Sequence, residues 1–77
     1  MREEIIEILK TIRPDIDYEI DRNLVSDGIF DSFDMVVLLA ALSEQYSIEI
    51  DTDDITEQNF DNVEEMANLV KKYVDKK

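Results

Sequence analysis

Apolar residues recur at helical spacing in three stretches of this chain, and that periodicity limits it to a helical fold. The first stretch must end near Pro14, because proline disfavours helical geometry at the residue before it. Acidic residues lead this stretch and Lys10 and Arg13 close it, as the helix dipole favours. Its apolar positions are Ile5, Ile6, Ile8, Leu9 and Ile12. The pattern predicts an amphipathic helix with one face in a core.

The last stretch predicts another amphipathic helix. Asp61 and Glu64 have the spacing of a capping box, so this helix is expected to begin near Asp61. Its apolar positions are Val63, Met66, Ala67, Leu69, Val70, Tyr73 and Val74, and its lysines are Lys71, Lys72, Lys76 and Lys77. The lysines stand where the negative end of the helix dipole favours them.

The middle stretch, within "GIFDSFDMVVLLAAL", predicts a helix that begins at Asp31 or Ser32 and runs to about Tyr46, since Asp and Ser are both good N-cap residues. At about 100° per residue, one face of this helix collects the expected core positions. These are Met35, Leu38, Leu39, Leu42 and Tyr46. The opposite side is apolar too, because Phe33, Val37 and Ala41 follow one another at four-residue steps. Part of that stripe is expected to meet a partner, since a chain this short cannot enclose it fully.

The connecting segments are acidic but carry apolar residues. The segment from Pro14 to Phe30 is expected to pack against the core through Ile16, Tyr18, Ile20, Leu24, Val25, Ile29 and Phe30. A short helical turn is expected around Ile55 to Asn59. The stretches "IDYEID" and "SIEID" alternate with period two, so a pair of short strands is the rival prediction.

Together these elements predict an all-α fold in a single domain over residues 1–77. The expected architecture is a small four-helix bundle, with three main helices, a short third helix and a long loop between the first and second helices.

Cysteine and histidine are both missing from the sequence, and this excludes most familiar catalytic and metal-binding arrangements. A lone hydroxyl without a neighbouring base is a weak nucleophile, so the chain is not expected to be an enzyme. Calcium loops of the EF-hand type starting at Asp17 or Asp51 lack the required glycine and closing glutamate, so no metal site is predicted. The N-terminus does not read as a signal peptide and no apolar run is long enough to span a membrane, so a cytoplasmic protein is expected.

The net charge of -12 is unevenly distributed. Between Pro14 and Glu65 there are sixteen acidic residues and one basic residue, Arg22. Such a surface argues against binding to nucleic acid or anionic lipid and favours partners with basic patches. The alternative is an acidic surface that only keeps the protein in solution.

Ser32 has two possible roles. It could cap the helix that follows, or Asp31 could do so and leave the Ser32 hydroxyl exposed in the first turn. A phosphate ester on that hydroxyl would lie at a helix N-terminus, where unpaired amide groups favour negative charge. Gly28 is the only glycine in the chain, and it is expected to form the turn that presents Ser32.

The chain resembles the acyl carrier proteins and the related peptidyl and aminoacyl carriers. The similarity lies in a glycine shortly before Asp-Ser, an apolar residue after the serine, and the apolar helix of "GIFDSFDMVVLLAALSEQYSIEI", followed by "ITEQNFDNVEEMANLV". It covers essentially the whole chain.

The resemblance implies that a separate magnesium-dependent phosphopantetheinyl transferase esterifies Ser32 with 4′-phosphopantetheine, and that acyl groups are held on its thiol as thioesters. A loading ligase or transferase and downstream acyl-transfer enzymes would be its partners, and the protein would act as a monomer. Asp31 and Asp34 would flank the attachment point and help the transferase to dock. The positions that would line or border an acyl chain are Val36, Leu39, Ala40 and Ile55.

The sequence departs from the carriers of fatty acid biosynthesis on the outer face of the middle helix. That face usually carries several glutamates, whereas here Val37, Ala41 and Ser43 leave it mostly uncharged, with Glu44 alone near its end. We therefore expect partners to dock on this face through apolar contact. "DSF" and "ITEQNF" look more like stand-alone carriers of dedicated pathways, including D-alanyl and other aminoacyl carriers. The alternative from another class is a small acidic helical adaptor in which Ser32 is only a cap.

Overall fold

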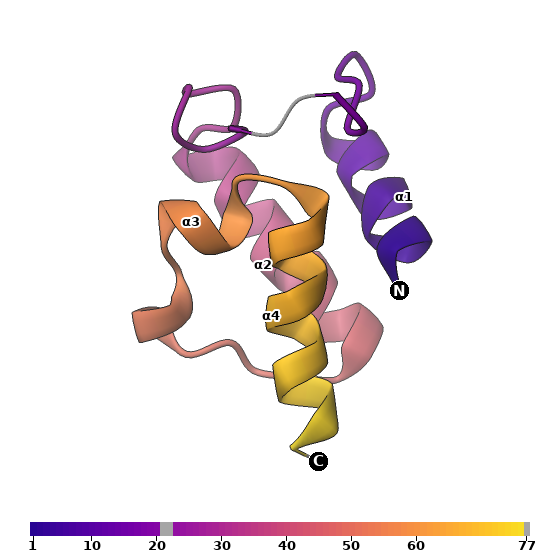
Figure 1. Cartoon of the computed structure of the whole chain (residues 1–77), viewed down its shortest axis with the longest axis vertical. Coiled ribbons are helices and arrows are strands. Elements are labelled where there is room, and N and C mark those ends of the chain that lie inside the picture. Colours follow the sequence, from indigo (N-terminus) through magenta and orange to yellow (C-terminus); the bar gives the residue numbers. More distant parts are fainter. Residues whose placement is uncertain (21–22, 77) are drawn as a thin grey trace.

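The computed structural model describes residues 1–20 and 23–76 (Figure 1). Its elements are α1 (Arg2–Ile12), α2 (Ser32–Tyr46), the short 3-10 helix η1 (Thr52–Asp54), α3 (Glu57–Phe60) and α4 (Val63–Asp75). No strand occurs among the described residues, so the rival prediction of paired strands is wrong there. The prediction of a small all-α bundle is confirmed. Arg22 and Lys77, two of the basic residues considered above, lie outside the described residues.

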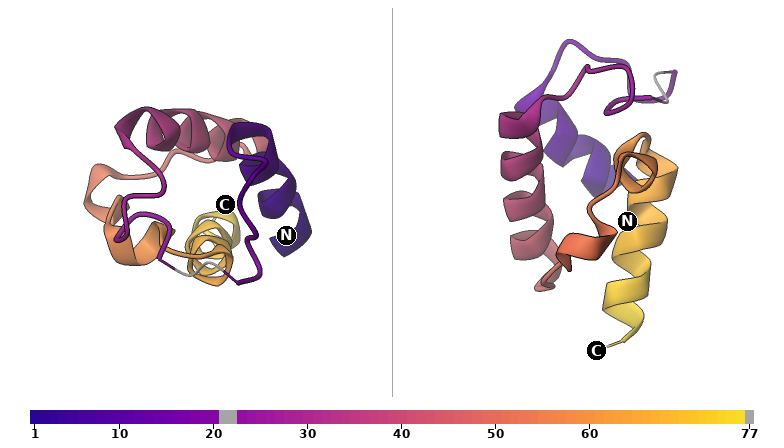
Figure 2. Two further views of the ribbon diagram at one scale, coloured as in Figure 1. Left: turned by 90° about the horizontal axis from the view of Figure 1, so that it is seen from above. Right: turned by 90° about the vertical axis from the view of Figure 1, so that its left-hand side faces the viewer.

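The three long helices do not simply alternate in direction. α1 runs opposite to α2, whereas α2 and α4 run the same way, because the segment of residues 47–62 returns along the molecule before α4 begins (Figures 1 and 2). α1 packs against both α2 and α4, and α3 packs against α4. The described parts of the loop from α1 to α2, residues 13–20 and 23–31, lie at one end of the molecule, and the second part leads directly into the first turn of α2 (Figure 1).

A single core joins the four α-helices and the loop between α1 and α2. Its buried residues are Ile5, Leu9, Tyr18, Leu24, Phe30, Leu38, Leu42, Ile48, Phe60, Val63, Met66, Leu69 and Val70. The apolar faces predicted for α1 and α4 are confirmed, because their other members are partly buried against the same cluster. On α2, Leu38 and Leu42 are fully buried, while Met35, Leu39 and Tyr46 are half-buried.

The loop between α1 and α2 is packed against this core, as predicted, except at Ile20. Tyr18 and Phe30 are buried with their rings edge to face, 6.3 Å between centroids. The Tyr18 hydroxyl donates to the carbonyl oxygen of Arg13 at 2.7 Å, which ties the loop to the end of α1. Ile20 is 73% exposed, so its predicted contact with the core is wrong. It ends a turn closed by its own N–H on the Asp17 carbonyl, and that turn holds the side chain in solvent.

The predicted start of the last helix is wrong by one residue. Asn62 is the N-cap of α4, and its side-chain oxygen accepts a hydrogen bond from the Glu65 N–H at 2.9 Å. Asp61 instead faces the long loop. Its carboxylate accepts hydrogen bonds from the N–H groups of Val25 (3.1 Å) and Ser26 (2.8 Å) and from the Ser26 hydroxyl (2.6 Å). These loop groups need an acceptor, and only tertiary packing brings Asp61 to them.

We expect Asp61→Asn to weaken the protein in a pH-dependent way. Burial of the Asp61 carboxylate raises its pKa, but hydrogen bonds from Ser26 and Val25 outweigh this, so the pKa lies below its ordinary value of 3.8. A group whose pKa falls on folding stabilises the fold above its unfolded pKa, and that stability is lost as the pH falls through the folded pKa. At neutral pH the variant should therefore be less stable by about 1 kcal/mol. Urea unfolding of both proteins from pH 7 down to pH 3 measures the difference, which should shrink below about pH 4. A difference that does not change with pH would contradict the assignment.

The short third helix is confirmed in kind but lies further along than predicted. Ile55 falls between η1 and α3, and α3 begins only after Thr56, whose hydroxyl oxygen accepts from the Asn59 N–H at 3.2 Å.

Two tyrosines hold the ends of elements together. The Tyr73 hydroxyl on α4 donates to the Asp54 carboxylate of η1 and accepts from the Asp51 N–H at 2.9 Å. The Tyr46 hydroxyl at the end of α2 donates to the Glu4 carboxylate of α1 at 3.0 Å. Burial and this carboxylate raise the pKa of Tyr46 to about 12, so the hydroxyl keeps its proton at neutral pH.

Candidate functional site

The turn that leads into α2 depends on Gly28. Its φ is 74°, a conformation that residues with a side chain rarely adopt, and its N–H donates to the Val25 carbonyl at 3.0 Å. No atom lies within 4 Å of where a Cβ would stand, so the requirement for glycine is conformational rather than steric. The turn directs the chain through Phe30, which is buried, to the start of α2.

Asp31 and Asp34 form a reciprocal cap at the start of α2. The Asp31 carboxylate accepts from the Asp34 N–H at 2.8 Å, and the Asp34 carboxylate accepts from the Asp31 N–H at 3.3 Å. This arrangement satisfies two backbone donors that a helix start otherwise leaves without partners. Asp31 is therefore the N-cap, and Ser32 is the first residue of the helix.

Ser32 is exposed, and its hydroxyl forms no hydrogen bond with any described residue. The first-turn amides of α2 and the positive end of its dipole favour a phosphate ester there. The two neighbouring carboxylates oppose such a charge, but that of Asp34 is paired with the Arg13 guanidinium at 3.4 Å. The residues around Ser32 thus fit a phosphate ester that points into solvent.

Arg13 also belongs to this site, which the sequence did not predict. From the sequence, Arg13 was expected only to interact favourably with the dipole of α1. Its guanidinium donates to the Ile29 carbonyl at 2.8 Å and to the Asp34 carboxylate at 3.4 Å. Twenty-one residues separate Arg13 from Asp34, so local spacing could not reveal the pair. The one available signal was a basic residue directly before the proline that ends α1.

The exposed apolar surface of α2 differs in detail from the predicted stripe. Phe33 is 74% exposed, Val36 64% and Val37 38%, and Ala40 is also exposed. We call these four residues the α2 stripe. Ala41, which was predicted to belong to this surface, is half-buried and lines a small cavity between α1 and α2.

The other candidate residues lie in different environments. Val36 and Ala40, expected to border an acyl chain, belong to the exposed α2 stripe. Leu39 is half-buried against the core, and Ile55 is exposed between η1 and α3. Glu44, expected at the docking face, is exposed near the end of α2.

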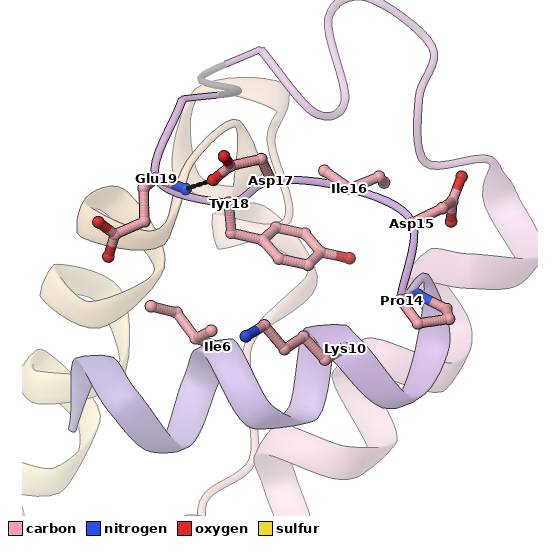
Figure 3. A pocket seen from close by; sticks show the side chains of 8 residues that line it. All are labelled: Ile6, Lys10, Pro14, Asp15, Ile16, Asp17, Tyr18 and Glu19. Atoms are coloured by element: carbon pink, nitrogen blue, oxygen red, sulfur yellow. Dashed lines mark hydrogen bonds between the residues drawn. The ribbon is translucent and has the colours of Figure 1, made fainter.

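A larger open cavity of about 500 Å³ lies between α1 and the loop that follows it (Figure 3). Its lining residues are Ile6, Lys10, Pro14, Asp15, Ile16, Asp17, Tyr18 and Glu19. None of the predicted site residues belongs to this lining, which mixes one lysine with three carboxylates. Among the described residues, no group of three or more acidic side chains is arranged to hold a metal ion. Nor is any helix in the described part of the chain long and apolar enough to cross a membrane.

Comparison with known proteins identifies the family of this chain. A family model described as "Phosphopantetheine attachment site" matches residues 1–70. No curated protein matches the chain. Members of this family carry 4′-phosphopantetheine covalently on a serine. Because the match covers 70 of the 77 residues, the chain belongs to the phosphopantetheine-binding carrier proteins.

Proposed function

We propose that this protein is an acyl carrier protein whose attachment residue is Ser32. In this role it holds acyl groups as thioesters and delivers them to partner enzymes. The observation that carries the proposal is the exposed hydroxyl of Ser32 at the first residue of α2, left free because Asp31 caps the helix. The protein has no catalytic activity of its own, and it acts as a monomer in the cytoplasm.

The other three serines of the chain are poorer candidates for attachment. The Ser26 hydroxyl is engaged with the Asp61 carboxylate at 2.6 Å. Ser43 is half-buried within α2. Ser47 caps the C-terminal end of α2, where the dipole disfavours a phosphate. Ser32 alone combines an exposed hydroxyl with a helix N-terminus.

The attachment reaction requires little from this chain beyond presentation of the hydroxyl. The Ser32 oxygen forms a bond to the phosphorus that bears pantetheine in coenzyme A, the pyrophosphate bond breaks, and adenosine bisphosphate leaves. The hydroxyl proton passes to a base of the transferase, because no described side chain of this protein is hydrogen-bonded to the Ser32 hydroxyl and able to take it. The bound group then supplies the thiol on which acyl groups are held.

Intact mass measurement after incubation with coenzyme A and a promiscuous phosphopantetheinyl transferase tests the proposal. A carrier gains the mass of one phosphopantetheinyl group, and fragmentation assigns it to the peptide that contains Ser32. No gain would favour the other class of function, a small acidic adaptor in which Ser32 has no role beyond the helix start.

Aminoacyl carriage, including D-alanyl carriage, is the second candidate. It is favoured by the α2 stripe, whose apolar surface differs from the glutamate-rich face expected of a fatty acid carrier. Offering fatty acids and amino acids in turn to the cognate ligase, followed by intact mass of the loaded protein, separates the two. If thioesters form with amino acids and not with fatty acids, the protein is an aminoacyl carrier, and the proposal of acyl carriage is wrong.

We expect Val37→Glu to impair loading by the cognate ligase about tenfold or more, because it places a charge in an apolar contact. Val37 is 38% exposed, so the folded structure has room for the larger side chain and the helical fold should survive. Asn68→Glu on the exposed side of α4 adds the same charge away from the α2 stripe and serves as the matched control. Steady-state loading rates measure the effect. Equal rates for both variants would rule out the α2 stripe as the docking surface.

A further inference from the structure

The side chain of Arg13, the C-cap residue of α1, reaches the turn ahead of Ser32. The Arg13 guanidinium donates to the carbonyl of Ile29, three residues before Ser32, at 2.8 Å. The same nitrogen lies 3.4 Å from the carboxylate of Asp34, two residues after Ser32. Arg13 therefore bridges the two sides of the attachment residue.

Both members of this bridge are themselves held in place. The Arg13 carbonyl accepts a hydrogen bond from the Tyr18 hydroxyl at 2.7 Å, and the Arg13 N–H donates to the Leu9 carbonyl at 2.8 Å. The Asp34 side chain is only 14% exposed and also accepts from the Asp31 N–H. The Asp34 carboxylate thus points toward the protein, where it accepts hydrogen bonds from both the Arg13 guanidinium and the Asp31 N–H.

We propose that Arg13 is a positioning residue for the modification of Ser32, acting through Asp34 and the Ile29 carbonyl. The inference rests on the proposed attachment at Ser32 and concerns how that hydroxyl is held. It assigns Asp34 to the support of the turn, in place of the expected role as a docking carboxylate for the transferase.

The two roles of Asp34 predict opposite effects of removing Arg13. If Asp34 docks the transferase, loss of Arg13 unmasks its negative charge, and loading should stay the same or become faster. If Arg13 positions Ser32, its loss frees the Ile29 carbonyl and loosens the cap. The hydroxyl then samples unproductive orientations, which lowers kcat more than it raises KM.

A double-mutant cycle tests this on the full chain, with Arg13→Gln, Asp34→Asn and the double variant as substrates of a promiscuous phosphopantetheinyl transferase. We expect each single variant to lower kcat about tenfold with KM changed less than about twofold. The double variant should be little worse than the poorer single variant, because both remove the same interaction. Arg13→Lys keeps the charge and should recover part of the rate.

Arg2→Gln provides the matched control. It makes the same change in net charge and removes exposed ion pairs with Glu19 (3.3 Å) and Glu64 (3.7 Å), far along α1 from Ser32. We expect its kcat and KM to equal those of the wild type. Unchanged or faster loading of Arg13→Gln, or effects of the two single variants that simply add, would overturn the positioning role.

Amide hydrogen exchange of the unmodified protein provides a readout that does not depend on loading. The N–H groups of Asp34 and Met35 are bonded to Asp31, at 2.8 Å and 3.0 Å, and should exchange faster in Arg13→Gln but not in Arg2→Gln. If the wild type is not loaded at all, the proposed attachment fails, and this measurement still decides whether Arg13 supports the turn. Equal exchange in both variants would refute that support.

Discussion

Ser32→Ala is expected to abolish the addition of phosphopantetheine completely while leaving the helical fold intact. Asp31 caps α2 and Ser32 makes no side-chain hydrogen bond to a described residue, so alanine at the first helical position should change the free energy of unfolding by less than about 0.5 kcal/mol. Intact mass after incubation with coenzyme A and transferase measures the first effect, and urea unfolding measures the second.

The remaining serines serve as controls for that result. Ser26→Ala, Ser43→Ala and Ser47→Ala should each still gain one phosphopantetheinyl group. Ser26→Ala should in addition lower stability slightly, because its hydroxyl donates to Asp61. Retention of modification in Ser32→Ala, or its loss in one of the other variants, would place the attachment elsewhere.

Phe60→Ala is expected to produce the largest loss of stability, about 3–5 kcal/mol. Phe60 is 0% exposed and ends α3, a helix of four residues that is too short to be stable without tertiary contacts. Removing the ring leaves a cavity between α3 and α4 as well as losing buried apolar area. Because native domains are stable by only about 5–15 kcal/mol, this loss removes a large share of the total stability.

Phe33→Ala is the matched control, since it removes the same ring from a position that is 74% exposed. Its free energy of unfolding should stay within about 0.5 kcal/mol of the wild type. Urea unfolding followed by circular dichroism compares the two variants. Similar losses for both would contradict the burial that separates them.

The three long helices could be predicted because of their apolar spacing, together with Pro14 after α1 and the Asp31 cap before α2. Among the wrong predictions, the role of Asp61 was decided by contacts over a long separation, and the exposure of Ile20 by a local turn. Asp61 does not cap α4, because its carboxylate accepts hydrogen bonds from the N–H groups of Val25 and Ser26, more than thirty residues earlier. Ile20 is apolar, but the turn that begins at Asp17 ends with its side chain in solvent.

The site divides in the same way. Gly28, Asp31 and Ser32 could be identified from the sequence, because a glycine turn and a helix cap act over a few residues. The inward orientation of the Asp34 carboxylate could not be predicted, because its partner Arg13 lies at the end of another helix. The apolar surface of α2 was foreseen in part. Val36 and Ala40 joined it, and Ala41 did not, because helix packing sets the rotation of α2 about its axis.

By itself, the sequence determined that this protein is helical, acidic and without cysteine or histidine, and that one serine stands at the start of an apolar helix. These properties depend on periodicity, charge and composition, which are local or additive. Only the tertiary structure decided which face of α2 is exposed, that Asp61 bonds the long loop while Asn62 caps α4, and that Arg13 is bonded on both sides of Ser32. Those features arise when packing brings distant backbone donors and acceptors together, because a buried polar group must then find its partner wherever the fold provides one.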